Sequence, residues 1–218
     1  MKLKHFAALV IFFVIAAAAA RGEEEKKEEG PEAMLAGMTE AFKEVKDYSA
    51  KFEWVEMKEK KEERQLCDFI FMKPDYQRIK VLAGGDKGSS AAYNPSKSTK
   101  KVAAKRGFFP TITLAKDSEM LGGFFDAGIY EDIDAVQGEA KNAEISELGE
   151  EKVGEYDTVK IEIVPEEPKE YSKTIAWIDK KTNLPIKVEY YKKDNLYGRK
   201  TWTDLKLNVG LGAKDFVP

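Results

Sequence analysis

The sequence predicts an α+β fold in which one amphipathic helix precedes a single antiparallel sheet. Apolar residues near the N-terminus recur at helical spacing, and from Tyr48 onward they alternate with a period of two. The strand-like segments lack the regular βαβ alternation that builds parallel sheets. The 218 residues, of which 43% are hydrophobic and 34% charged, suit one globular domain of roughly 150–200 residues.

The first twenty residues have the pattern of a secretory signal peptide. A short basic segment precedes an apolar run from Phe6 to Ala20 that ends in alanines. Because this run is shorter than the roughly 20 residues that cross a membrane, we expect cleavage after Ala20, with an uncleaved anchor as the alternative. Cleavage removes His5, the only histidine, and the loss of two lysines takes the net charge from −3 to −5. The expected location is the periplasm.

A charged segment separates this leader from the folded domain. Residues 21–30, "RGEEEKKEEG", have nothing to bury and are expected to form a flexible tether. The domain then covers residues 31–218 and begins with a helix predicted over 31–48. Proline suits its first turn, and Met34, Met38 and Phe42 form part of one apolar stripe.

The next segments are predicted strands at 48–54, 65–72 and 76–82, followed by a hairpin about Asn94-Pro95. The stretch "FIFMKPDYQRIKV" is unusual because its first strand is apolar on both faces, which is typical of strands buried on both sides. Cys67, the only cysteine, precedes this stretch on the side of Phe69 and Phe71. It is interpreted as a small buried hydrophobe, and no internal disulfide can form.

The middle of the chain predicts one or two short helices. Asp117 or Ser118 is a plausible N-cap, apolar residues follow, and Gly122-Gly123 weakens helical structure by about 1 kcal/mol per glycine relative to alanine. The C-terminal third again predicts strands, with turn residues between them, at 158–164, 174–179, 185–191 and 199–207.

The residues that carry enzyme chemistry are scarce. The sequence has no G-x-S-x-G, P-loop, H-E-x-x-H or paired C-x-x-C motif, and the mature chain has no imidazole. Acidic turns such as "EDID" lack the spacing of a calcium loop, and the mixed charges exclude a basic stripe for nucleic acid. We therefore expect no enzyme, no cofactor, no metal and no nucleic-acid partner; a hydrolase with a carboxylate pair is a minor alternative.

Several segments together resemble the bacterial lipoprotein-localisation factors, the LolA- and LolB-like periplasmic carriers. "KPDYQRIKV" resembles their proline turn before a strand that bears an arginine, here Arg78. "WIDKKTNLPIKVEYYKKDN" is similar to their strand-turn-strand, and "LNVGLGAKDF" resembles their closing segment. With the first helix and "YSAKF", the likeness covers most of residues 31–218. It implies an incomplete, or half, β-barrel: one curved antiparallel sheet wrapped around an N-terminal helix and a helical lid.

The resemblance also implies a function, a monomeric carrier that binds acyl chains of lipoproteins or lipids and passes them toward the outer membrane. Its partners would be membrane-bound donor and acceptor proteins, and Arg78 would hydrogen-bond to the lid and gate the cavity. An envelope-stress sensor or protein-interaction module on the same half-barrel is the alternative. The aromatic and apolar residues that are candidates for the cavity wall, each of which could instead be plain core, are Phe52, Trp54, Phe69, Phe71, Phe124, Phe125, Trp177, Val188 and Trp202.

Overall fold

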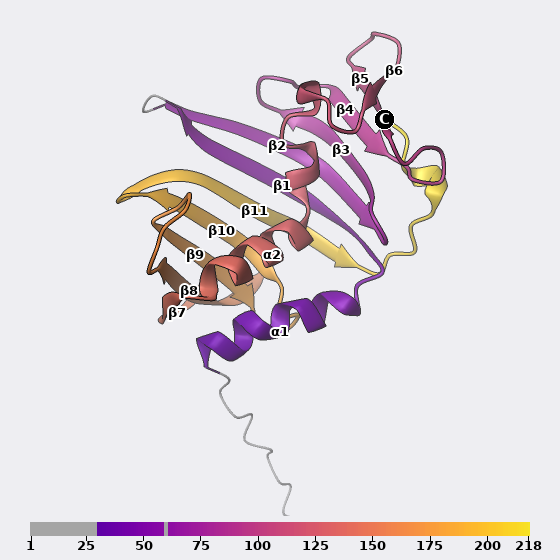
Figure 1. Cartoon of the computed structure of the whole chain (residues 1–218). Coiled ribbons are helices and arrows are strands. Elements are labelled where there is room, and N and C mark those ends of the chain that lie inside the picture. The colour runs from indigo at the N-terminus through magenta and orange to yellow at the C-terminus, as the bar shows by residue number, and fades with distance from the viewer. Residues whose placement is uncertain (1–29, 59–60) are drawn as a thin grey trace, which may run out of the picture.

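The computed structural model describes residues 30–58 and 61–218. The predicted signal peptide, 1–20, and all of the predicted tether except Gly30 lie outside the described residues. Within the described part of the chain, eleven strands form one antiparallel sheet that does not close, which confirms the predicted incomplete barrel (Figure 1). The order across the sheet is β6-β5-β4-β3-β2-β1-β11-β10-β9-β8-β7.

The strands are longer in the first hairpin and at the C-terminal end than in the middle of the chain. Their bounds are β1 (Asp47–Lys58), β2 (Lys61–Met72), β3 (Tyr76–Ala83), β4 (Ser89–Tyr93), β5 (Lys101–Arg106), β6 (Ile112–Ala115), β7 (Ala143–Val153), β8 (Tyr156–Pro165), β9 (Lys173–Asp179), β10 (Pro185–Lys192) and β11 (Asn195–Leu207). The first and last strands pair with each other, with Phe52 opposite Trp202, so this pairing joins the two halves of the sheet.

The helices lie on the concave side of the sheet, except the last (Figure 1). They are α1 (Pro31–Lys43), η1 (Glu119–Leu121), η2 (Phe124–Ala127), α2 (Ile129–Ala140) and η3 (Ala213–Asp215), where η denotes a 3-10 helix. α1 starts at the predicted proline but ends before Tyr48, because Tyr48 is fully buried within β1. Ser118 caps η1 through its hydroxyl, as predicted.

Two strands and the length of α2 were not predicted from the sequence. β6 and β7 are the two edges of the sheet, and most of their residues are exposed or half-buried. An edge strand that faces solvent has little need for apolar alternation, so its sequence carries a weak pattern. α2 runs for twelve residues after the glycines, longer than the short helices predicted there.

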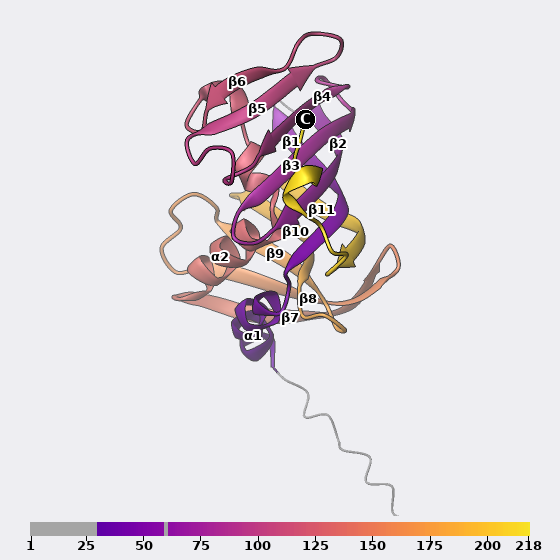
Figure 2. The same cartoon turned by 90° about the vertical axis from the view of Figure 1, so that its right-hand side faces the viewer.

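The C-terminal segment explains why the end of β2, which contains Phe69 to Met72, is apolar on both faces. Phe71 points to the concave side, where its ring lies 5.9 Å from that of Phe42 in α1. On the opposite, convex side the segment after β11 crosses β3, and the Phe216 ring lies 5.3 Å from that of Tyr76 (Figure 2). Ile70 shares this convex face and is buried. The strand is therefore covered on both sides, by a helix and by the chain's own end.

Candidate functional site

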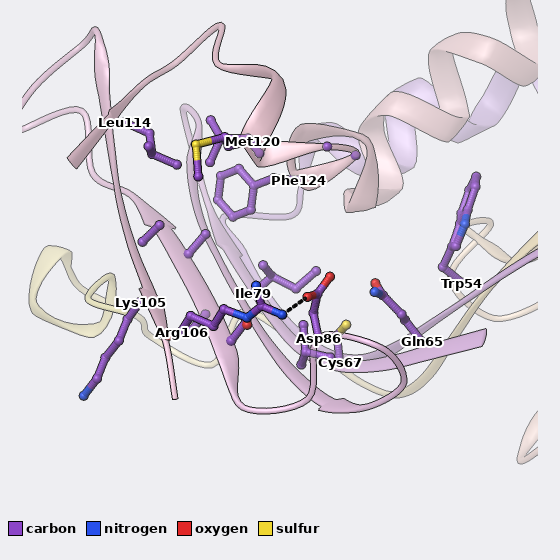
Figure 3. A pocket seen from close by; sticks show the side chains of 18 of the residues that line it. Trp54, Gln65, Cys67, Ile79, Asp86, Lys105, Arg106, Leu114, Met120 and Phe124 are labelled. Carbon is purple, nitrogen blue, oxygen red and sulfur yellow. Dashed lines mark ion pairs between the residues drawn. The ribbon is translucent and has the colours of Figure 1, made fainter. Parts of the chain in front are cut away.

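The concave face is filled in one half and hollow in the other. Under α1 and α2, the main core packs residues of both helices against β1, β2 and β8–β11. Between β1–β6 and the segment from Glu119 to Ala127, here called the lid, there is a cavity of about 890 Å³ (Figure 3). Ligand sites typically span roughly 300–1,000 Å³, so this cavity has room for a sizeable ligand.

Small and apolar side chains from neighbouring strands form the floor of the cavity. Each strand directs alternate residues to its concave face, which brings these positions side by side. Ala91 and Ala104 leave open space where larger residues would fill it, and Cys67, Val81 and Phe52 close the deep end. Burial raises the pKa of the Cys67 thiol to about 11, so this cysteine is an inert wall residue, as predicted.

The lid is built from short 3-10 turns rather than from a continuous helix. η1 ends at Gly122, whose φ of +51° favours glycine, and η2 begins after Gly123. Phe124 points down into the cavity, whereas Met120 is 75% exposed at its mouth (Figure 3). Such single turns hold few backbone hydrogen bonds, so the lid can shift at a low cost in free energy.

Six charged residues line the cavity, one of which is Asp126 in the lid. Asp86 and Arg106 form an ion pair at 3.5 Å, seen in Figure 3, with Glu56, Lys105 and Glu119 nearby on the lining. The apolar floor and charged rim suit a ligand with a long apolar part and a polar end.

Four polar contacts fasten the C-terminal end of the lid and the start of α2 to the sheet. The Tyr48 hydroxyl accepts from the amide of Ile129 at 2.9 Å, and the Trp202 indole donates to the carbonyl of Ala127 at 3.1 Å. The ammonium of Lys200 donates to the carbonyl of Asp126 at 2.8 Å and to the carboxylate of Asp132 at 2.9 Å. The lid is thus anchored where η2 meets α2 and is free of such contacts around Gly122.

The ion pair in this anchor is buried. Asp132 is fully buried in α2, Lys200 in β11 is 7% exposed, and the Tyr190 hydroxyl donates to the second oxygen of Asp132. Burial raises the pKa of Asp132, although Lys200 and Tyr190 act in the opposite direction. Neighbouring Glu131 also has a raised pKa, chiefly through burial, and its Oε2 has no hydrogen-bond partner among the described residues.

Replacing Glu131 by glutamine is expected to raise the free energy of unfolding by about 1 kcal/mol at pH 7, since it removes the charge of a half-buried carboxylate of which only Oε1 has a hydrogen-bond partner, Gln77, among the described residues. Because the folded state holds the Glu131 proton to higher pH than the unfolded chain, its contribution is present at low pH and is lost as pH rises through the folded pKa. The gain should therefore shrink in acid. Urea unfolding at several pH values measures it, with exposed Glu144→Gln as the control. A less stable variant at pH 7 would mean that the charge is favourable at the start of α2.

The structure brings three of the nine predicted wall residues to the cavity: Phe52, Trp54 and Phe124 line it. Phe125 packs beside it, 5.5 Å from the ring of Tyr93. Four others belong to the filled half of the concave face: Phe69, Phe71, Val188 and Trp202. Their roles in ligand binding stay predictions.

Trp177 lies on the other face of the sheet. Its neighbours Ala176 and Ile178 belong to the concave core, so alternation directs Trp177 to the convex side. There Lys187 lies 3.7 Å from its ring centroid and Lys160 lies 5.0 Å away. The prediction that Trp177 lines the cavity is therefore wrong, because its side chain lies on the convex face of β9.

Sequence reasoning missed most of the cavity floor and the turn after β5. These lining residues include Ile79, Val81, Ala91, Ala104, Leu114 and the Phe109-Pro110 turn. The available signal was the pair of alanines in each of "SSAAY" and "KVAAKR", because small residues in adjacent strands leave room above a sheet.

Arg78 does not contact the lid. It lies on the convex face of β3 and donates to the backbone carbonyl of Asp215 in the C-terminal segment at 3.0 Å. The predicted gating bond is thus replaced by a bond to the chain's end, because Gln77 and Ile79, not Arg78, face the concave side.

Replacing Arg78 by leucine is expected to lower the free energy of unfolding by about 1–2 kcal/mol, since one charge-assisted hydrogen bond is lost. The C-terminal segment should also be digested faster by a carboxypeptidase. Lys80→Leu, at an exposed position on the same face of the same strand, is the matched control. Unchanged digestion would show that this bond does not hold the segment.

The described residues, 30–58 and 61–218, contain neither a metal-binding cluster nor a helix that could span a membrane. No cluster of three or more histidine, cysteine, aspartate or glutamate side chains there could hold a metal ion. None of the helices in this part of the chain has the length and apolar character to cross a bilayer.

Comparisons with known proteins agree on the fold. A family model described as "Uncharacterized protein" matches residues 110–209. The comparison with curated proteins gives no match. Among solved structures, MucB is 14% identical with a TM-score of 0.55, over 86% of this chain and 62% of MucB. This chain thus corresponds to less than two thirds of MucB.

Two further structures match over nearly their whole length. The lipoprotein LppX of Mycobacterium tuberculosis is 12% identical with a TM-score of 0.54, over 84% of this chain and 98% of LppX. An uncharacterized conserved protein of Thermus thermophilus is 11% identical with the same TM-score, over 87% and 95%. At this identity the likeness shows the fold alone, and the incomplete barrel predicted from the sequence is confirmed.

Proposed function

We propose that the protein is a non-enzymatic carrier that binds an acyl chain of a lipoprotein or lipid in the cavity under the lid. The observation that carries this proposal is the 890 Å³ hollow with an apolar floor in a sheet that is otherwise filled. A solid domain would close such a space, because empty apolar cavities lower stability. The walls stay apart because they belong to one continuous curved sheet.

The chemistry of the lining selects a flexible hydrocarbon. Its floor offers methyl, methylene and aromatic groups, and few of its lining residues are charged. Each buried methylene contributes about 0.8 kcal/mol, so about ten of them give about 8 kcal/mol, which corresponds to micromolar affinity. The polar end of the ligand would then lie at the rim, beside Asp86 and Arg106.

The place of action follows from the sequence. The signal peptide at residues 1–20 would direct the chain to the periplasm, and residues 21–30 would leave the domain of residues 31–218 on a short tether. In that compartment a monomeric carrier would receive its cargo from a membrane-bound donor and pass it to an acceptor toward the outer membrane.

Native mass spectrometry of protein purified from its own envelope tests the proposal. We expect a bound species with the mass of a lipid or acylated peptide, and one-to-one uptake of the fluorescent fatty acid cis-parinaric acid after delipidation. Failure of the folded protein to take up the fatty acid would contradict a carrier. A stable complex with a membrane protein and an empty cavity would favour the sensor or interaction module instead.

A further inference from the structure

The turn between β5 and β6, residues 107–111, presents two aromatic side chains to solvent. Phe108 is 106% exposed and Phe109 is 71% exposed. The turn itself is held by backbone bonds, from the amide of Phe109 to Arg106 at 3.1 Å and from that of Gly107 to Gly88 at 3.2 Å. The two rings are thus displayed by a fixed turn at the end of the sheet furthest from α1 (Figure 1).

Exposed apolar side chains gather at this end of the molecule. Eight large hydrophobic residues are exposed in the described part of the chain, and half of them are Phe108, Phe109, Ile112 and Met120. Phe109, Ile112 and Met120 also line the cavity, and Phe108 adjoins them in the turn. A cluster of this kind on a folded domain marks a surface that meets an apolar partner.

The three strands β4–β6 are rich in cations, with Lys87, Lys105 and Arg106 at the end of the aromatic turn and the other four cations at the opposite end. Residues 87–116 contain seven lysines and arginines and no acidic residue, in a chain whose net charge is −3. Arg106 pairs with Asp86 and Lys116 with Asp75, while the other five cations form no ion pair within the described residues. Lys87 and Lys105 are exposed near the aromatic turn, and Figure 3 shows Lys105 directed away from the cavity.

We infer that this turn docks on an anionic lipid surface, with Phe108 and Phe109 inserted at the level of the headgroups. A bilayer offers both partners at once, since acyl chains accept the aromatic rings and anionic headgroups attract the lysines. Docking in this way would turn the mouth of the cavity toward the membrane. The inference goes beyond the proposed function, because a surface of this kind binds lipid whether or not the cavity holds an acyl chain.

Flotation with vesicles of phosphatidylethanolamine and phosphatidylglycerol, against phosphatidylcholine alone, tests the inference. Every variant should carry the same N-terminus, because the apolar run at 6–20 would itself bind lipid. We expect the wild type to prefer the anionic vesicles and to lose binding as salt is raised. Absence of this preference would overturn the inference.

Two variants with matched controls locate the surface. Phe108→Ser is expected to weaken vesicle binding about tenfold, whereas Leu148→Ser, on the opposite edge strand β7, should have no effect. Lys87→Glu is expected to weaken it about fivefold. Lys97→Glu, at the other end of the β4–β5 hairpin and about 20 Å away, should matter less, because charges are screened beyond about 10 Å.

The same variants separate this inference from the carrier proposal. Phe108 does not line the cavity, so Phe108→Ser should take up cis-parinaric acid as the wild type does. Wild-type vesicle binding by Phe108→Ser would overturn the docking surface and leave the carrier proposal standing. Loss of a bound membrane protein in that variant, with vesicle binding intact, would likewise overturn it and assign the turn to a protein partner.

Discussion

Replacing Lys200 by methionine is expected to lower the free energy of unfolding by about 3–5 kcal/mol. The substitution leaves the carboxylate of Asp132 fully buried without its counter-charge and removes the donor to the carbonyl of Asp126. The pKa of Asp132, already raised by burial, should rise further. Since a raised carboxyl pKa favours the folded state at low pH and costs stability as pH rises, the loss should be smaller in acid.

Urea unfolding at pH 5 and pH 8 measures this effect. Lys51→Met is the matched control, because its partner Asp68 is as exposed as Lys51 itself and the pair should contribute less than about 1 kcal/mol. Adding Asp132→Asn to Lys200→Met should restore part of the stability, since the variant then contains no buried unpaired charge. A loss below about 1 kcal/mol in Lys200→Met would show that water reaches the pair in solution.

Replacing Ala104 by phenylalanine is expected to weaken the uptake of cis-parinaric acid about a hundredfold. The new ring enters the cavity above β5 and displaces about three to four methylenes of the ligand, at about 0.8 kcal/mol each. Stability should change little, because the ring fills existing space. Fluorescence titration against the delipidated protein gives the affinity.

Ala103→Phe is the control for this substitution, because neighbouring residues in a strand point to opposite faces and Ala103 does not line the cavity. Its uptake should equal that of the wild type. Equal loss in both variants would trace the effect to distortion of β5, and equal retention would place the ligand elsewhere.

The sequence predicted the elements well where one face of a strand or helix is buried. The segments 48–54 and 185–191, in which apolar residues alternate, form the central strands β1 and β10. A strand that buries one face needs an apolar residue at every second position, so its sequence shows the pattern. The edge strand β7, with mostly exposed residues, carries no such pattern. The phase of a strand was harder to assign, as the outward position of Trp177 shows.

The cavity could be predicted only through the family resemblance. Whether Phe52 lines a hollow or a solid core depends on where α2 and the lid lie above the sheet, and neighbouring Phe69 falls under the helices instead. The pairing of Lys200 with Asp132 joins residues 68 positions apart, and no local pattern distinguishes these two from the many other charged residues. Residue spacing and composition do not indicate which residues distant in the sequence come into contact in the fold.

The pairing of β1 with β11 has a consequence for how the chain acquires its shape. The two halves of the sheet meet only along this pair, so the last strand must be present before the first strand can complete its edge. Contacts between such distant residues slow folding, because a long loop must close before they form. A chain that emerges N-terminus first therefore keeps an open edge at β1 until nearly all of it is available.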